Sequence, residues 1–188
     1  MRRRAVGIFS RVIAPARAAS RARSAASEAP SGASRWTVAH EVVRATSSGG
    51  ATSTYGIALS DRAFDLIGDA TAFRGVRAPG ERVGRGEVVA ELEWRGFTRT
   101  AGDELYHSKW ANASGTREIR APFDCVIERF NAAAIEDAYM NVRGPETWLL
   151  EVRAKSGACA ALLDEDEYEA LVEKEEIEAA DRANAAYP

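Results

Sequence analysis

One lysine stands out as a group that could carry chemistry. Lys109 is one of three lysines in the chain, with Lys155 and Lys174. It follows residues 88–94 and precedes residues 116–122, two segments in which apolar and polar residues alternate. Alternation with a period of two predicts strands, here joined by a long excursion. An amine near the end of such an excursion would be accessible to other proteins, so we expect function there.

Other constellations of reactive residues are not recognisable. The sequence has no nucleophile–base pattern, no phosphate-binding loop and no dinucleotide fingerprint. His40 and His107 lie too far apart to give a metal-ligand spacing, and we interpret His40 as a structural histidine of a strand. Acidic residues 164–167 lack the alternating spacing and glycine of a calcium loop and are interpreted as a helix cap. Cys125 and Cys159 are too few for a disulfide scaffold and are expected to be reduced and partly buried.

The charge is unevenly distributed along the chain. Residues 1–27 hold seven arginines and no acidic residue, which leaves 18 basic against 28 acidic residues and a net charge of −10 for the remainder. An acidic body argues against nucleic acid as a partner, because phosphate binding needs a positive field. It suits docking onto basic patches of other proteins. No apolar stretch approaches the ~20 residues of a transmembrane helix, so no membrane insertion is expected.

The first 34 residues are rich in arginine, alanine and serine. This composition is typical of an organelle transit peptide, which would be disordered and separate from the fold. The alternative is a basic, disordered N-terminal arm. Because arginine is dense from the second residue, the sequence favours the mitochondrial matrix over a plastid.

Short strands separated by turns are predicted along the body. Strands are expected at residues 35–44, 52–59, 70–78, 123–131 and 147–153, and helices at 60–67 and from 162 onward. Ser60 and Asp164 are expected as the N-caps of these helices. Turns are predicted at residues 46–50, 78–81 and 83–86. This pattern is typical of a small sandwich or barrel. We expect a body at residues 35–178 and a flexible tail at 179–188.

The order of short motifs resembles the glycine cleavage system H protein over roughly residues 35–177. His40-Glu41 sits where that family begins with His-Glu, and Tyr55-Gly56-Ile57-Ala58 is similar to its "GIT" stretch. The other matching segments are residues 63–69, 79–83, 86–93, 121–131, 148–149 and 162–168. No single motif is specific, but their order and spacing together are.

This resemblance implies a mostly β fold, a β-sandwich or barrel of the lipoyl/biotinyl-carrier type with short flanking helices and a C-terminal helix. Members of the family are carriers rather than enzymes. A lipoyl group on a hairpin lysine shuttles an aminomethyl group between glycine decarboxylase and aminomethyltransferase, and a dihydrolipoyl dehydrogenase reoxidises it. The implied physics is tethering, because a covalent arm raises the effective concentration of the reactive sulfur at each partner.

The chain departs from the family at the attachment position. The family lysine lies eight residues before a proline, and eight before Pro122 is Ser114, which cannot form the lipoyl amide. Extra residues between Glu93 and Ser114 lengthen the hairpin. If Ala90 pairs near Ala121, as in the family register, the tip falls near residues 105–106. Lys109 is then the candidate for a displaced lipoyl site; the alternative is an ordinary exposed lysine.

Aromatic residues gather on the extended hairpin, expected at residues 94–115. They are Trp94, Phe97, Tyr106 and Trp110. Aromatic residues are favoured in interface hot spots, so they are candidates for partner binding. They would equally rigidify a long hairpin by packing on each other. A second functional hypothesis therefore stands beside the carrier: a fold without lipoate that acts as a binding or structural subunit through this hairpin. A biotin carrier is a distant third, since no Met-Lys-Met occurs.

Overall fold

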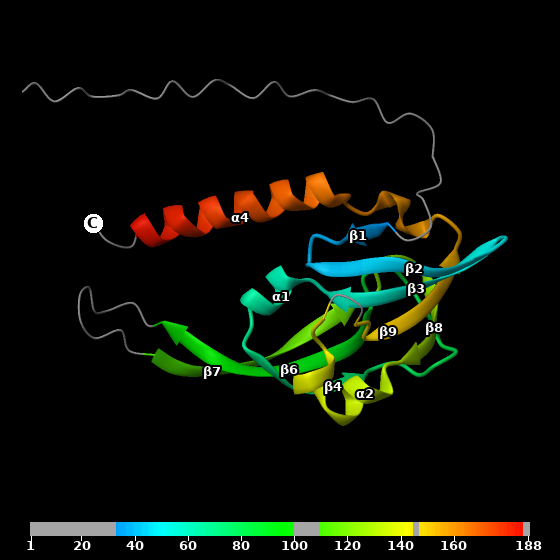
Figure 1. The fold of residues 1–188 in the computed structure, drawn as a ribbon, viewed down its shortest axis with the longest axis horizontal. Coiled ribbons are helices and arrows are strands. Elements are labelled where there is room, and N and C mark those ends of the chain that lie inside the picture. The colour runs from blue at the N-terminus through cyan, green and yellow to red at the C-terminus, as the bar shows by residue number, and fades with distance from the viewer. Residues whose placement is uncertain (1–32, 100–109, 145–146, 186–188) are drawn as a thin grey trace, which may run out of the picture.

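The computed structural model describes residues 33–99, 110–144 and 147–185, which form two antiparallel sheets with helices at their edges (Figure 1). The larger sheet has the order β1 (Ser34–Trp36), β2 (Glu41–Gly49), β3 (Thr52–Leu59), β9 (Leu150–Lys155), β8 (Cys125–Phe130) and β5 (Arg82–Val83). The smaller sheet has the order β4 (Asp69–Gly75), β6 (Val88–Arg99) and β7 (Trp110–Arg120). The helices are α1 (Asp61–Asp65), α2 (Ala132–Glu136), α3 (Ala138–Asn141), the 3₁₀ helix η1 (Ala158–Ala161) and α4 (Glu165–Ala185). The expected mostly β fold with a C-terminal helix is confirmed.

The core lies between the two sheets. Alternate residues of the strands point into it, as the period of two requires. Ile57 of β3, Leu92 of β6 and Ile119 of β7 are completely buried. Tyr55 packs edge-on against Phe123, with ring centroids 5.1 Å apart. The apolar residues of the alternating pattern are therefore the ones that the strands bury in the core.

The expected strand at residues 35–44 is interrupted, and this part of the prediction was wrong. A turn separates β1 from β2, because the Thr37 hydroxyl accepts hydrogen bonds from the backbone N–H of Ala39 and Glu41 at 3.2 and 3.1 Å. His40 ends this turn with a φ of 65°, a left-handed conformation that is uncommon outside glycine. The predicted turn at 46–50 also begins later, since β2 continues to Gly49.

The helix caps agree with the sequence. The Ser60 hydroxyl accepts a hydrogen bond from the Ala63 N–H at 3.2 Å and begins α1. Asp164 and Glu167 form a reciprocal capping box at the start of α4: the Glu167 N–H donates to the Asp164 carboxylate at 2.9 Å, and the Asp164 N–H donates to Glu167 at 3.2 Å. The acidic segment 164–167 is thus a cap. The described residues contain no cluster of three or more His, Cys, Asp or Glu side chains that could hold a metal ion.

The C-terminal helix is longer than expected. It continues past residue 178 to Ala185, so the predicted boundary between body and tail falls inside α4. Its N-terminal end is fixed to the sheet, because Trp36 and Leu163 exchange two backbone hydrogen bonds of 3.0 and 2.9 Å. Figure 1 shows α4 running alongside β1 and then on beyond it. Within the described part of the chain, none of the helices has the length and apolar character to span a membrane.

Both cysteines are free, as predicted, and they are buried rather than partly buried. Burial, with a smaller contribution from the nearby Asp124 charge, raises the pKa of the Cys125 thiol to about 11. This cysteine is therefore protonated near neutral pH and unsuited to nucleophilic chemistry.

Candidate functional site: the hairpin, its cleft and the helix latch

The β6–β7 hairpin extends well beyond the body. Its ladder pairs Val88 with Arg120 at one end and Arg99 with Trp110 at the other. Figure 1 shows these strands projecting past α1. Four residue pairs follow the Arg95–Ser114 pair, which adds about 13 Å at 3.3 Å per residue. We call the part formed by residues 95–99 and 110–114 the finger.

The register differs from the one expected from the family. Ala90 pairs with Ile119, not with Ala121. Ala121 instead exchanges backbone hydrogen bonds with the turn before β6, because its N–H donates to the Glu87 carbonyl at 2.9 Å and its carbonyl accepts from Gly86 at 2.8 Å. A bulge between Val88 and Ala90 changes the register of the ladder by one residue.

Two of the predicted site residues, Lys109 and Tyr106, lie outside the described residues. Phe97 and Trp110 lie on the finger, where Phe97 pairs with Asn112 and Trp110 ends the ladder. These positions bring three of the four predicted aromatics onto one hairpin.

Trp94 is the predicted aromatic whose side-chain contacts the structure describes. It is half-buried, and its indole covers its cross-strand partner Gly115. A Cβ at position 115 would lie 3.0 Å from the Trp94 ring. A glycine in a strand weakens it, and an aromatic ring laid over the gap restores packing. Trp94 therefore rigidifies the base of the finger.

Ser114, in the position of the family lysine, is exposed in the middle of a continuous ladder. Its hydroxyl cannot form the lipoyl amide, so the described part of the hairpin does not fit that group. The other two lysines belong to the body: Lys155 ends β9 opposite Thr52, and Lys174 lies on α4, 3.8 Å from Glu178. Lys109 is the remaining lysine of the chain and directly precedes Trp110.

An open cleft of about 1050 Å³ lies beside the base of the finger. Asp69, Arg95 and Ser114 line it as one row across β4, β6 and β7. Gly68, which follows α1, Tyr139 of α3 and Arg143, which follows α3, complete its walls. Sequence reasoning missed this cleft, because residues from four separate segments meet there only in the folded chain.

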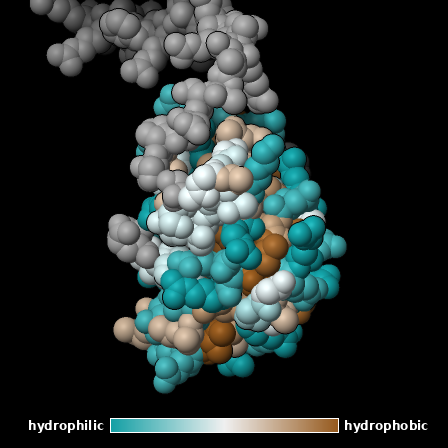
Figure 2. Space-filling model, turned by 90° about the vertical axis from the view of Figure 1, so that its right-hand side faces the viewer, coloured by the Kyte–Doolittle hydropathy of each residue, from teal (hydrophilic) through white to brown (hydrophobic). Residues whose placement is uncertain are grey.

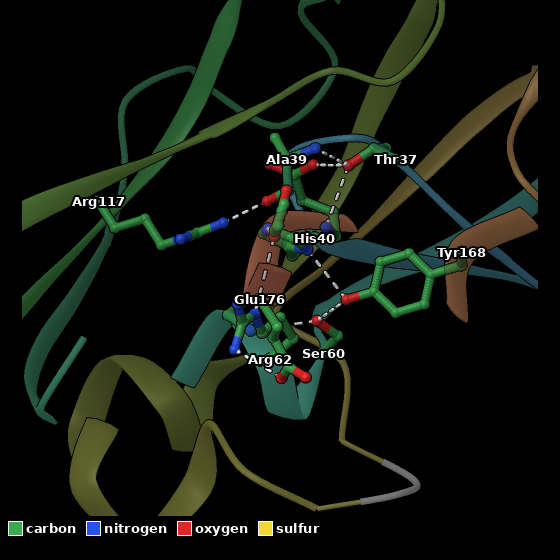
Figure 3. A network of polar contacts seen from close by, with 11 residues as sticks. Thr37, Ala39, His40, Ser60, Arg62, Arg117, Tyr168 and Glu176 are labelled. Atoms are coloured by element: carbon green, nitrogen blue, oxygen red, sulfur yellow. Dashed lines mark hydrogen bonds and ion pairs between the residues drawn. The ribbon is translucent and has the colours of Figure 1, made fainter. Parts of the chain in front are cut away.

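A buried polar network, also missed, fixes α4 to the body (Figure 3). The Tyr168 hydroxyl lies 2.7 Å from the Ser60 hydroxyl and 3.1 Å from His40 Nδ1. His40 Nε2 in turn lies 3.3 Å from the Glu175 carboxylate. We call these four residues, His40, Ser60, Tyr168 and Glu175, the latch. Only the His-Glu motif at 40–41 hinted at it, and that motif does not reveal partners on a distant helix.

Burial sets the protonation of the latch. It lowers the pKa of His40 below its ordinary value of 6.5; the Glu175 charge opposes this shift, and the charges of Arg117 and Arg62 add to it. A neutral imidazole has one donor and one acceptor. Because a carboxylate only accepts, Nε2 carries the proton and Nδ1 accepts from the Tyr168 hydroxyl. Ser60 donates to Tyr168 while it accepts from the Ala63 N–H, so each hydroxyl of the network has a donor and an acceptor role.

Further contacts extend the latch in both directions. The Tyr168 ring stacks on Trp36 with centroids 5.4 Å apart, and Arg62 binds Glu176 at 3.3 Å. Arg117 of β7 donates to the Ala39 carbonyl in the turn that carries His40. The base of the hairpin, the turn and α4 are therefore joined by direct contacts.

The opposite end of the molecule offers little for docking. Figure 2 shows this face as mostly hydrophilic, with small separate hydrophobic areas. Exposed large hydrophobic residues are spread over the described part of the chain: Ile135, Tyr139 and Met140 lie on α2 and α3, and Val38, Leu66, Val76 and Ile177 lie elsewhere.

No protein-family model matches the sequence, and no curated protein sequence matches it. Among solved structures, the fold is similar to that of a glycine cleavage system H protein from Mycobacterium marinum. The TM-score is 0.50 at 20% sequence identity, over 73% of this chain and 94% of that chain. At this identity the similarity shows a shared fold. The chain therefore has the β-rich fold of a lipoyl-carrier-like protein.

Proposed function

We propose that this protein is a carrier of the H-protein type, which presents a lipoyl group on Lys109 to partner enzymes. One observation carries the proposal: a lipoyl-carrier-like fold extends the hairpin on which such carriers hold their group, and Lys109 directly precedes Trp110, the first described residue of the returning strand. Fold does not by itself imply function, so the lysine must be tested.

The residues of the hairpin have separate roles in this proposal. Lys109 supplies the amine that holds the group, and Trp94 stiffens the base over Gly115. When bound, lipoate supplies a dithiolane that can accept a small group and be reoxidised. The described finger extends about 13 Å beyond the Arg95–Ser114 pair, so a partner must accommodate a longer projection than the body alone presents.

The partners proposed are glycine decarboxylase, aminomethyltransferase and dihydrolipoyl dehydrogenase. The arginine-rich leader supports a mitochondrial matrix location, with a plastid as the alternative. In this role the protein is a carrier component of a multienzyme system and does not itself catalyse a reaction.

The test is the intact mass of the protein produced in a lipoylation-competent host. We expect one lipoyl adduct, lost in Lys109→Arg and retained in Lys155→Arg, an exposed lysine of the body. Unmodified wild-type protein from a host that lipoylates a control carrier would contradict the proposal.

A second function is favoured by Ser114, which replaces the amine at the family position. In this alternative the protein lacks lipoate and acts as a binding or structural subunit through its finger. Deletion of residues 96–113 would then abolish binding to glycine decarboxylase, whereas Lys109→Arg would leave it unchanged. Binding that survives the deletion would rule out the finger as the docking element.

A further inference from the structure

Among the described residues, the two arginines of the cleft lack the carboxylate partners that several other arginines of the sheets have. Three exposed sheet arginines illustrate the paired arrangement. Such pairs are Arg74–Glu91 at 2.5 Å, Arg129–Glu151 at 2.7 Å and Arg153–Glu128 at 2.9 Å. Arg95 and Arg143 both line the cleft, both are exposed, and neither forms an ion pair with any described residue. The cleft therefore presents two un-neutralised guanidinium groups on an otherwise acidic body.

The neighbouring carboxylate does not neutralise them. Asp69 faces Arg95 directly across the β4–β6 ladder, and both residues are exposed. Cross-strand neighbours of opposite charge at this spacing commonly pair. Within the described part of the chain they form no ion pair, so the Arg95 guanidinium keeps its donors for another acceptor.

The second arginine is held in place by an aromatic ring. The Arg143 guanidinium carbon lies 4.5 Å from the centroid of Phe64, a buried residue of α1. Stacking on an aromatic face uses the plane of the guanidinium and leaves its edge donors available. Arg143 therefore presents its hydrogen-bond donors from a restricted orientation.

The wall between the arginines is built to be rigid. Gly68 touches the backbone of β6 so closely that a Cβ there would lie 1.9 Å from the Arg95 carbonyl oxygen. A bulge between Ala70 and Ala72 leaves Thr71, which lines the cleft, outside the ladder. Bulges of this kind often re-aim groups beside binding sites. Close backbone contact and the bulge together fix the shape of this wall.

We propose that the cleft binds a small organic anion, whose carboxylate or phosphate group is held by Arg95 and Arg143. Guanidinium groups match both kinds of oxyanion through paired N–H donors. Asn112 and Ser114, on the same wall, add a neutral amide and a hydroxyl for the rest of the ligand. The volume of about 1050 Å³ exceeds what inorganic phosphate needs and suits a molecule of cofactor size. This site is independent of lipoylation at Lys109.

The experiment is a titration of the uniformly ¹⁵N-labelled protein, followed by amide chemical shifts. Pyrophosphate and citrate serve as probes for phosphate and carboxylate chemistry, with sodium chloride at matched ionic strength as the control. We expect saturable shifts at the amides of Gly68, Thr71 and Gly96. Arg95→Gln and Arg143→Gln should each weaken binding about tenfold, the loss of one charge-assisted contact.

The matched control is Arg85→Gln, which removes the same charge from an exposed position in the turn before β6, away from the cleft. It should leave the affinity for both probes unchanged, and Arg95→Lys should retain part of it. Saturation by one probe alone would support the site and assign its anion class. Shifts that do not saturate, that chloride reproduces, or that Arg85→Gln reduces equally would overturn the proposal. Unfolding midpoints of each variant verify that the fold is intact.

Discussion

Removal of a single oxygen from the latch should destabilise the protein measurably. Tyr168→Phe keeps the ring that stacks on Trp36 but deletes the hydroxyl that lies 2.7 Å from Ser60 and 3.1 Å from His40. Each net hydrogen bond contributes about 1 kcal/mol, and a buried acceptor left unpaired costs about 1–3 kcal/mol. Ser60 keeps its bond to the Ala63 N–H, whereas His40 Nδ1 loses its partner. We expect a loss of about 2–3 kcal/mol in the free energy of unfolding.

The measurement is urea denaturation followed by far-ultraviolet circular dichroism. The control is Tyr139→Phe, since Tyr139 is 62% exposed and its hydroxyl has no hydrogen-bond partner among the described residues. That variant should stay within about 0.5 kcal/mol of the wild type. If Tyr168→Phe lies in the same range, the latch does not contribute to stability and α4 is held by its other contacts.

Two further predictions concern the same region of the fold. Burial lowers the pKa of His40 below 6.5, so His40 binds protons more readily in the unfolded chain than in the folded one. The stability that comes from keeping His40 neutral is therefore complete above pH 6.5. It declines as the pH falls below that value. In His40→Asn, whose side chain tolerates the left-handed backbone, the free energy of unfolding should depend less on pH below 6.5. The measurement is urea denaturation at a series of pH values. An unchanged pH dependence would exclude His40 as the titrating group. Gly68→Ala should lower the free energy of unfolding by about 1–3 kcal/mol or more, because its Cβ would lie 1.9 Å from the Arg95 carbonyl oxygen. The control is Gly84→Ala, whose Cβ would have only ordinary contacts of 3.9 Å, and its thermal unfolding midpoint should stay close to that of the wild type. Equal midpoints for the two alanine variants would contradict the close contact.

The general fold was accessible from local patterns. Alternating apolar residues identified most strands, since a strand with one buried face must show a period of two. Ser60 and Asp164 were identified as caps because their side chains act on amides only three residues away. These features depend on neighbours along the chain, so the sequence contains nearly all of the information that they need.

The hairpin register shows where local reasoning ends. The family pattern predicted that Ala90 pairs near Ala121, but the fold pairs Ala90 with Ile119. The departure begins at the base of the hairpin, where Ala121 pairs with the preceding turn and Val88 already pairs with Arg120; a bulge at the start of β6 then changes the register by one residue. Nothing in the composition of residues 88–90 distinguishes a bulge from a regular strand, because the difference lies in which backbone groups face each other.

His40 illustrates the same limit at a functional level. Sequence reasoning placed it in a strand, whereas it ends a turn and contacts Tyr168, 128 residues further along the chain. The interruption depends on the Thr37 hydroxyl, which bonds the backbone of its own turn. The burial that shifts the pKa of His40 depends on α4 docking over it, which no short motif encodes.

The sequence alone determined the class of fold, the acidic body, the long segment between the two hairpin strands and the serine, Ser114, at the position where the resemblance leads one to expect a lysine. These follow from residue types and spacings, which act locally. The tertiary structure decided which residues meet: the row of Asp69, Arg95 and Ser114, the cleft that Arg143 completes, and the latch that holds α4. Such groupings join segments far apart in the chain, and only the packing of two sheets around one core brings them within reach of a common ligand.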